Sequence, residues 1–307
     1  MTNRYVVTFY SIEKIEDYLK VGRSVERFCT KRNIVGTFFS TLQGINTTLS
    51  GNKIDLEELI EMLETKFNFK IQDLTWSIAK AKPFKRLKIK CREKLLPLEG
   101  NFDPTVTSGK HLNHSEWNSL ISDPDTILID VRNDYETEIG TFKNSLIPNM
   151  KNLTEFPEFV KSKLSNDKER NIAMFCTGGI RCEIASSFMI DQGFKNVNQL
   201  DGGILRYLKD SKDENLWQGE CFVFDERVTV NSNLEPGDYY QCFGCRRPLS
   251  ELDLQSKFYE KGVSCHHCYE SSSPKDKERY AQRQLQIELA EQRGHVHMGA
   301  NAKQKLK

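Results

Sequence analysis

The sequence predicts a protein of mixed α+β and α/β class in three parts, spanning residues 1–100, 108–216 and 217–307. In the first part, strand and helix patterns follow one another in the order β-α-β-β-α-β. In the second part, short apolar strands alternate with helical segments, which is typical of a parallel sheet. The third part holds two cysteine pairs and then a charged helical segment.

Length and composition agree with two or three ordinary domains. The chain has 307 residues and a formal net charge of +1, so no global charge indicates a nucleic-acid partner. No apolar run is long enough to cross a membrane, and the N-terminus lacks a signal-peptide core. Nine cysteines without a secretion signal favour reduced thiols and metal ligation over disulfides. We therefore expect a cytoplasmic protein with no membrane partner.

The first part is expected to contain four strands and two helices. The strands are predicted at residues 5–10, 34–39, 44–50 and 74–79, and the helices at residues 12–30 and 56–63. This order is that of the ferredoxin-like, or acylphosphatase-like, sandwich. Residues 87–91 predict one additional strand that leaves this domain.

Basic side chains crowd the end of the first part. They are Lys80, Lys82, Lys85, Arg86, Lys88, Lys90, Arg92 and Lys94. In residues 87–90, alternation places the lysines on one face of a strand and the aliphatic side chains on the other. Such a stripe can follow a phosphate backbone, while a solvated strand face is an equally good interpretation.

A cysteine between a buried strand and a helix is the main candidate for chemistry. Cys176 ends the apolar run 172–175, Gly178 and Gly179 permit a tight turn, and a helix follows. Backbone N–H groups converge at such a junction and the helix dipole is positive there, and both effects favour the nucleophilic thiolate. Arg181 can add a fixed positive charge. A buried, unreactive cysteine is the alternative.

Asp130 and Arg132 follow another apolar strand and are assigned supporting roles. Ligands of open α/β sheets bind at the carboxyl ends of the strands, where Asp130 and Cys176 both fall. Capping of the following loop is the alternative for Asp130. For Arg132 the alternative is an ion pair with Glu136 that holds the shape of the site. Cys182 is expected to be structural, with a role as resolving thiol as its alternative.

Three motifs of the second part resemble the rhodanese domain in type and in order. They are Asp130-Val131-Arg132, the Cys-x4-Arg loop from Cys176 to Arg181, and the turn Leu200-Asp201-Gly202-Gly203. The resemblance implies a rhodanese-like α/β domain in which Cys176 is the active thiol. The active-loop backbone is then that of Thr177, Gly178, Gly179 and Ile180.

The cysteine pairs of the third part have the spacing of a structural zinc site. Cys242/Cys245 and Cys265/Cys268 form a C-x2-C…C-x2-C pattern with 19 residues between the pairs. All four ligand positions are filled, so a structural zinc is expected, with metal-free packed thiols as the alternative. His266 and His267 are expected to be exposed. A charged helix and a flexible basic tail containing His295 and His297 are predicted to follow.

Nearly the whole chain resembles a bacterial family of rhodanese-containing, oxygen-dependent tRNA uridine hydroxylases, which form 5-hydroxyuridine at the wobble position. The resemblance rests on residues 43–51, 83–88, 130–136, 176–183 and 293–295 and on the cysteine pairs. It implies that Cys176 is required for activity, that molecular oxygen is a co-substrate and that the tRNA anticodon stem-loop is the partner. The candidate tRNA contacts are Lys85, Arg86, Lys88 and Lys90. The chain departs from the family at Gln43, where Glu is usual, and at Ile184, where Lys is usual.

The sequence holds no signature of a haem, flavin, nucleotide or 2-His-1-carboxylate iron site. One hypothesis for the chemistry is addition of the Cys176 thiolate to C6 of uracil, which makes C5 nucleophilic toward an oxidant. Two other functions stay open. One is a sulfurtransferase that carries sulfur on Cys176, and the other is a non-catalytic rhodanese-type adaptor.

Overall fold

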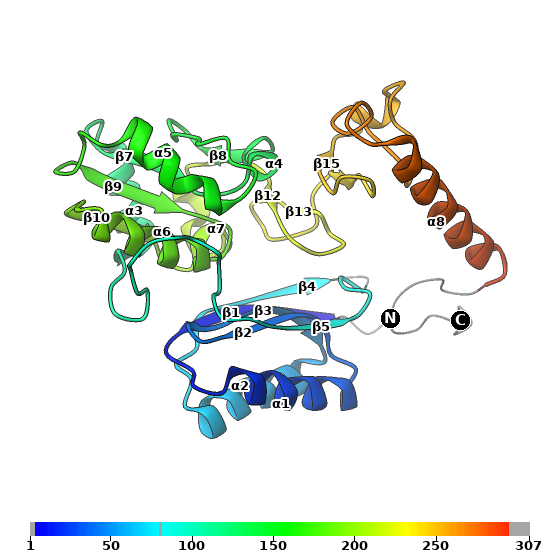
Figure 1. Cartoon of the computed structure of the whole chain (residues 1–307), viewed down its shortest axis with the longest axis horizontal. Helices are drawn as coiled ribbons and strands as arrows, with labels where there is room; N and C mark the ends of the chain where they lie inside the picture. Colours follow the sequence, from blue (N-terminus) through cyan, green and yellow to red (C-terminus); the bar gives the residue numbers. More distant parts are fainter. Residues whose placement is uncertain (1–3, 80–81, 295–307) are drawn as a thin grey trace.

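A mostly antiparallel sheet covered on one face by two helices forms the N-terminal part of the computed structural model (Figure 1), in which residues 4–79 and 82–294 are described. Its elements are β1 (Arg4–Ile12), α1 (Tyr18–Lys31), β2 (Val35–Thr41), β3 (Gly44–Gly51), α2 (Lys53–Phe67) and β4 (Gln72–Ala79). The predicted β-α-β-β-α-β order is confirmed. The strand order is β4-β1-β3-β2-β5, with β5 at one edge.

Both helices of this part begin at a capping side chain. Asp17 accepts a hydrogen bond from the backbone N–H of Lys20, and Asn52 accepts one from that of Ile54. The helix expected from residue 12 therefore begins at Tyr18, because Ile12 still belongs to β1. Asn68 adopts the left-handed conformation and ends α2.

Strand β5 (Leu87–Cys91) pairs in parallel with β2 and completes a five-stranded sheet. It was expected to leave the domain; instead Leu87 and Ile89 pack on the core between sheet and helices. Lys88 and Lys90 are exposed on the opposite face, as the alternation predicts. Lys80 lies outside the described residues.

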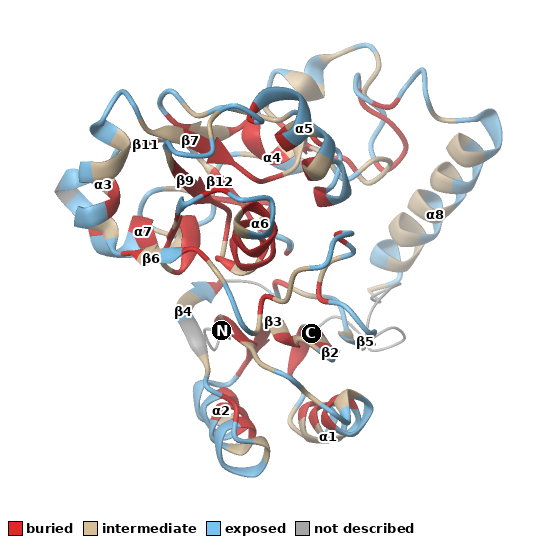
Figure 2. Ribbon diagram, turned by 60° about the vertical axis from the view of Figure 1, so that its left-hand side comes forward, coloured by how far each residue is buried: buried red, intermediate tan, exposed pale blue. Residues whose placement is uncertain are grey.

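The central part is built on a four-stranded parallel sheet of order β6-β10-β9-β7. Its elements are β6 (Lys110–Leu112), α3 (His114–Ser122), β7 (Ile127–Asp130), α4 (Asp134–Thr137), β8 (Gly140–Phe142), α5 (Phe156–Lys163), β9 (Asn171–Phe175), α6 (Ile180–Asp191), β10 (Asn196–Leu200) and α7 (Gly203–Ser211). Figure 2 shows α6 as the most completely buried of these helices. Because β7 and β9 are parallel neighbours, the segments after their carboxyl ends lie side by side.

The C-terminal part consists of short hairpins and one long helix. The strands are β11 (Trp217–Gly219), β12 (Cys221–Phe222), β13 (Thr229–Val230), β14 (Tyr240–Gln241) and β15 (Pro248–Leu249), and the helix is α8 (Pro274–Gln292). Strand β11 pairs with β8, which joins this part to the central one. Single 3-10 turns occur at Leu153–Glu155, Lys212–Glu214 and Asp253–Gln255. The expected tail with His295 and His297 lies outside the described residues.

The helix-free face of the N-terminal sheet is turned toward the other two parts (Figure 1). The Tyr10 hydroxyl donates to Oε1 of Glu183 on α6 at 2.7 Å. Arg227, between β12 and β13, donates to Oγ of Ser77 on β4 at 2.9 Å. The connecting segment after β5 buries Leu95 and Leu98 in the central core. In the described part of the chain no helix is long and apolar enough to span a bilayer.

A candidate active site between the Cys176 loop and the N-terminal sheet

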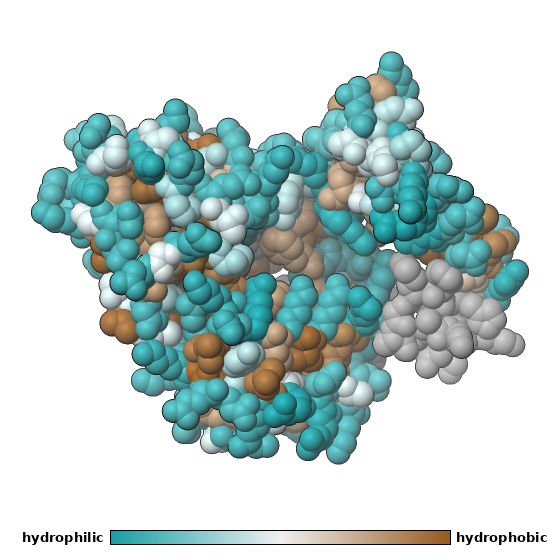
Figure 3. Space-filling view, viewed as in Figure 1, coloured by the Kyte–Doolittle hydropathy of each residue, from teal (hydrophilic) through white to brown (hydrophobic). Residues whose placement is uncertain are grey.

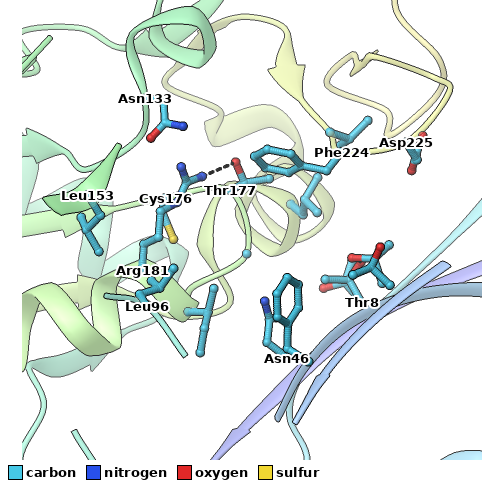
Figure 4. A pocket seen from close by; sticks show the side chains of 18 of the residues that line it. Thr8, Asn46, Leu96, Asn133, Leu153, Cys176, Thr177, Arg181, Phe224 and Asp225 are labelled. Atoms are coloured by element: carbon cyan, nitrogen blue, oxygen red, sulfur yellow. Dashed lines mark hydrogen bonds between the residues drawn. The ribbon is translucent and has the colours of Figure 1, made fainter. Parts of the chain in front are cut away.

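A cavity of about 530 Å³ lies where the three parts of the molecule meet. Its floor is the helix-free face of the N-terminal sheet, with Thr8, Asn46 and Lys88 among the lining residues. The Cys176 loop forms the facing wall, and the turn between β12 and β13 adds Phe224. The surface is hollowed in the same region (Figure 3), and the close view shows these side chains converging from different elements (Figure 4). Residues far apart in the sequence therefore line one cavity.

The loop after β9 places backbone N–H groups around the Cys176 sulfur. The N–H of Gly179 donates to Sγ at 3.2 Å, and the N–H groups of Arg181 and Cys182 at the start of α6 help to lower the pKa of this thiol. Gly179 has φ of +92°, a conformation that L side chains rarely adopt, so glycine is needed for the turn that places its N–H at the sulfur. The predicted convergence of donors at this junction is present in the structure.

The start of α7 donates two backbone hydrogen bonds to the same loop. The backbone N–H of Ile204 donates to the carbonyl of Cys176 at 2.9 Å, and that of Leu205 donates to Thr177 at 3.1 Å. A Cβ on Gly203 would lie 2.5 Å from the Cys176 carbonyl oxygen. The close approach of the two segments therefore requires the second glycine of the Gly202-Gly203 turn.

The surroundings of Cys176 favour its thiolate. Burial alone raises the pKa of the thiol, since the side chain is 0% exposed. The hydrogen bond from the Cys182 thiol, the charge of Arg181 and the backbone N–H groups outweigh burial and lower the pKa to about 6. Burial and the neighbouring Cys176 sulfur raise the pKa of Cys182 well above its usual value, so Cys182 keeps its proton and serves as the donor.

Arg181 is fixed by a buried carboxylate. Its two terminal nitrogens donate to the two oxygens of Glu136 at 2.6 and 2.8 Å. Thr177 links the pair, because its hydroxyl donates to Glu136. The same hydroxyl accepts a hydrogen bond from Arg181 (Figure 4). The expected alternative that Glu136 pairs with Arg132 is wrong. No motif of the sequence identified Glu136 as the partner of Arg181, which lies 45 positions further along the chain.

Asp130 and Arg132 form a separate ion pair behind the loop. The guanidinium donates to both carboxylate oxygens of Asp130, at 2.8 and 2.6 Å, and lies 5.0 Å from the ring of Trp217. Both side chains are fully buried, and neither belongs to the described residues that line the cavity. Asp130 and Arg132 therefore do not contact a ligand in this cavity, but they can support the loop from behind.

A second polar network links α6 to the N-terminal sheet, and the sequence did not reveal it. Glu183 accepts from Tyr10 and lies 3.1 Å from Nε2 of His111, whose Nδ1 lies 3.4 Å from Asp201. These two carboxylates, through their hydrogen bonds first, raise the pKa of His111 to about 10. A protonated imidazole thus neutralises Glu183 one residue after Cys182.

The four cysteines of the C-terminal part converge as expected. Their sulfur atoms all lie within 4.8 Å of one another, with 3.9 Å between Cys242 and Cys268 and 3.7 Å between Cys245 and Cys265. Tetrahedral zinc with Zn–S bonds of about 2.3 Å requires sulfurs about 3.8 Å apart, so the donor set suits that ion. These four residues would hold a structural zinc. His266 and His267, adjacent in the second knuckle, are exposed as predicted.

The cysteine cluster also anchors α8. Arg283 of this helix donates to the carbonyls of Phe243 and Gly262 at 2.9 and 2.8 Å. A Cβ on Gly244 would lie 2.4 Å from the carbonyl oxygen of Val263, so the first knuckle packs tightly against the second. Metal binding at this cluster would therefore stabilise the position of the helix.

Of the four predicted tRNA contacts, two line the cavity and two lie outside it. Lys88 and Lys90 line the cavity, whereas Arg86 is exposed outside it. Lys85 lies 3.6 Å from Glu226 and 5.1 Å from the ring of Phe243. Partial burial, and then Arg86, Lys90 and other cations, lower the pKa of Lys88. The positive charges gathered around Lys88 favour an anionic ligand at this place.

Two known domains match separate parts of this chain. Residues 4–95 match the UPF0176 acylphosphatase-like domain, and residues 113–210 match the rhodanese-like domain. The chain joins a UPF0176 acylphosphatase-like domain to a rhodanese domain. The predicted fold class is confirmed, with the parallel sheet in the rhodanese domain and a cysteine-rich segment and helix at the end.

Solved structures resemble one domain at a time. The rhodanese-like domain of the Alr3790 protein from Anabaena sp. is 19% identical, covers 36% of this chain and 78% of its own, and gives a TM-score of 0.30. The single-domain sulfurtransferase RDL2 of Saccharomyces cerevisiae is 20% identical, with 36% and 97% covered and a TM-score of 0.29. An acylphosphatase from Coxiella burnetii is 11% identical, with 29% and 94% covered and a TM-score of 0.23.

Alkylation of Cys176 by iodoacetamide should titrate with a midpoint near pH 6, because its pKa is lowered to about 6 and the thiolate is the reactive form. Mass spectrometry of the modified peptide at a series of pH values gives the rate. Cys91, exposed on β5 with a raised pKa, serves as the internal control and should react appreciably only at higher pH. A midpoint for Cys176 near the ordinary value of about 8.5 would contradict the description of the loop.

The purified chain should carry one zinc ion, and Cys245→Ser should lose it together with resistance of the C-terminal part to proteolysis. Elemental analysis gives the metal content, and limited digestion followed by mass spectrometry locates the cuts. Cys91→Ser, at an exposed cysteine outside the cluster, is the control and should keep the metal. A metal-free wild-type chain that resists digestion as well as the loaded one would support packed thiols instead.

Proposed function

We propose that this protein hydroxylates the wobble uridine of tRNA to 5-hydroxyuridine, with molecular oxygen as co-substrate and Cys176 as nucleophile. The observation that carries the proposal is the cavity between the Cys176 loop and the polar face of the UPF0176 domain. Its volume of about 530 Å³ is within the range of small-ligand sites and is sufficient for one nucleoside. An enzyme that acts on a base must take it out of its stack and enclose it in this way.

The proposed reaction begins with addition of the Cys176 thiolate to C6 of uracil, which leaves an enolate across C5 and O4. The enolate attacks molecular oxygen at C5, and protonation gives a hydroperoxide. A thiol reductant supplies two electrons and two protons, so that the hydroperoxide becomes the alcohol and one oxygen leaves as water. Loss of the C5 proton then expels the Cys176 thiolate and restores the C5–C6 double bond. Uridine, oxygen and two thiols thus give 5-hydroxyuridine, water and a disulfide.

The residues around Cys176 assist this sequence by holding charge in place. Arg181 and the backbone N–H groups stabilise the thiolate before attack and again when it is expelled. Glu136 and Thr177 keep the guanidinium from moving as that charge appears and disappears. The facing sheet limits the entry of water, which would otherwise protonate the enolate before oxygen reacts.

The anticodon stem-loop of tRNA is the proposed partner, and the cytoplasm the proposed compartment. Lys88 and Lys90 lie on the cavity wall, where they can contact the phosphates flanking an extruded nucleotide. Lys85 and Arg86 extend the positive surface beyond it toward the cysteine cluster. Phosphate contacts position RNA without reading its sequence, so this surface would serve several tRNAs equally.

Nucleoside mass spectrometry tests the proposal. In tRNA from cells that lack the protein, 5-hydroxyuridine and its derivatives should decrease, and wild type should restore them while Cys176→Ala should not, because no nucleophile then reaches C6. Cys29→Ala, a buried cysteine of the UPF0176 domain core, is the control and should complement. Unchanged 5-hydroxyuridine in the deletion strain, in the absence of a second pathway, would overturn the proposal.

Charge reversal on the cavity wall should weaken tRNA binding without changing the thiol. For Lys88→Glu/Lys90→Glu we expect a loss of about two phosphate contacts, seen as a shallower dependence of affinity on salt. Fluorescence anisotropy with a labelled anticodon stem-loop measures this, and Cys176 alkylation verifies the loop. The control is Lys53→Glu/Lys66→Glu on α2, on the opposite face of the sheet. Equal weakening by both double variants would show that only total charge matters.

Sulfur transfer is a second candidate, favoured by the N–H groups around Cys176. Such a cradle stabilises a cysteine persulfide as well as a thiolate, and the rhodanese match agrees with that chemistry. A sulfurtransferase would pass sulfur from thiosulfate to an acceptor through Cys176. Thiosulfate turnover combined with altered thiolated nucleosides and unchanged 5-hydroxyuridine would select this function over hydroxylation.

A further inference from the structure

One face of strand β3 supplies polar groups to the cavity, while the other face belongs to the core. Ile45 and Leu49 are buried between sheet and helices, whereas Asn46 and Thr48 line the cavity. The Asn46 side chain points from the sheet toward the Cys176 loop (Figure 4). The chemistry proposed at Cys176 assigns no role to these polar groups of β3.

The Asn46 carboxamide is free to bind a ligand, whereas three of the hydroxyl groups near it on the sheet are engaged. Thr8 and Thr48 bond to each other through their hydroxyls at 3.1 Å, and the Ser77 hydroxyl accepts from Arg227. Within the described residues, the Asn46 side chain makes no hydrogen bond to protein although it is half-buried. A carboxamide offers a donor and an acceptor side by side, which suits a ligand edge with the complementary pair.

Phe224 provides an apolar surface in the same cavity. Its side chain is 60% exposed, and its ring lies 5.9 Å from the Arg181 guanidinium. The turn that carries it is well held, since Val223 donates to the carbonyl of Val228 at 2.9 Å and Asp225 pairs with Arg227 at 2.6 Å. An aromatic ring on a fixed turn, facing a cavity beside a nucleophile, is suited to stack on a planar ligand.

We propose that Asn46 and Phe224 form the recognition site for a uracil base, with Phe224 stacked on its face and Asn46 paired with its N3–H and an adjacent carbonyl oxygen. The assignment rests on the proposed function, which it deepens by naming the residues that select the base. In the proposed orientation the carboxamide oxygen accepts from the uracil N3–H and the amide NH2 donates to the adjacent carbonyl oxygen, whereas cytosine would require the carboxamide to be turned over. An aspartate at position 46 would still accept from the uracil N3–H but would repel the uracil carbonyl, and it would accept from the exocyclic amine of cytosine, so the preference for uracil would fall.

Protection of Cys176 from iodoacetamide by uridine or cytidine 5′-monophosphate tests the site on the full chain. Wild type should be protected better by the uridine nucleotide. Asn46→Asp should reduce the ratio of uridine to cytidine protection by about 5- to 100-fold. Asn46→Leu, which adds no charge, should also abolish the preference. Asn133→Asp is the matched control, because it places the same charge on the cavity wall from the rhodanese side and should keep the wild-type ratio.

The same protection assay tests stacking on Phe224 separately from pairing with Asn46. Phe224→Leu should weaken protection by both nucleotides about tenfold with an unchanged ratio, whereas Phe224→Trp should retain it. Two results would overturn the inference, namely a wild-type preference preserved in Asn46→Asp and Asn46→Leu, or no protection by either nucleotide. Selective protection by uridine nucleotide in a protein that leaves tRNA 5-hydroxyuridine unaffected would refute the proposed function and support this recognition site.

Discussion

A thiolate can exist at a fully buried position only if fixed donors and a cation replace the water that it has lost. Cys176 meets this condition through backbone N–H groups, the Cys182 thiol and Arg181. Arg181 in turn needs Glu136, because an unpaired buried charge is unstable; removal of one partner of such pairs costs about 3–5 kcal/mol in other proteins. The Gly179 conformation, the closeness of Gly203 and the position of α4 all follow from this one requirement.

The second requirement is that the thiolate meets its substrate and not bulk water. The rhodanese domain alone leaves the loop open on the side where the UPF0176 sheet lies. The Tyr10–Glu183–His111 network fixes α6 to that sheet, and Arg227 fixes the turn with Phe224 to Ser77. The UPF0176 domain thereby forms one wall of the candidate site, and the polar face of its sheet lines the cavity.

Most of the secondary structure, the backbone donors of the Cys176 loop and the cysteine cluster could be predicted because each depends on residues close together in the chain. Hydrophobic alternation located β3 and β5, and the glycines after Cys176 located the turn. The alternative that paired Glu136 with Arg132 was wrong because it relied on nearness in sequence, whereas Arg181 reaches Glu136 only through the packing of α6. His111 carried no local signal, since its role depends on Glu183 and Asp201, which the fold brings to it.

The cavity itself could not be predicted, because its walls come from all three parts of the chain. Residues such as Asn46 and Phe224 belong to ordinary strand and turn patterns, and their exposure to one space appears only once the parts are assembled. The same holds for Lys88 and Lys90: alternation placed them on one face of β5, and the structure turns that face toward Cys176.

Trapping with 5-fluorouridine under anaerobic conditions tests the central claim most directly. Fluorine makes C6 more electrophilic, and without oxygen the C5 enolate takes up a proton, which gives a saturated 5-fluoro adduct that remains bonded to the sulfur. An anticodon stem-loop with this base at the wobble position should become covalently attached at Cys176, as located by mass spectrometry of the cross-linked peptide. Failure to form this adduct, or attachment at another cysteine, by a protein that hydroxylates the uridine stem-loop in air would contradict the account.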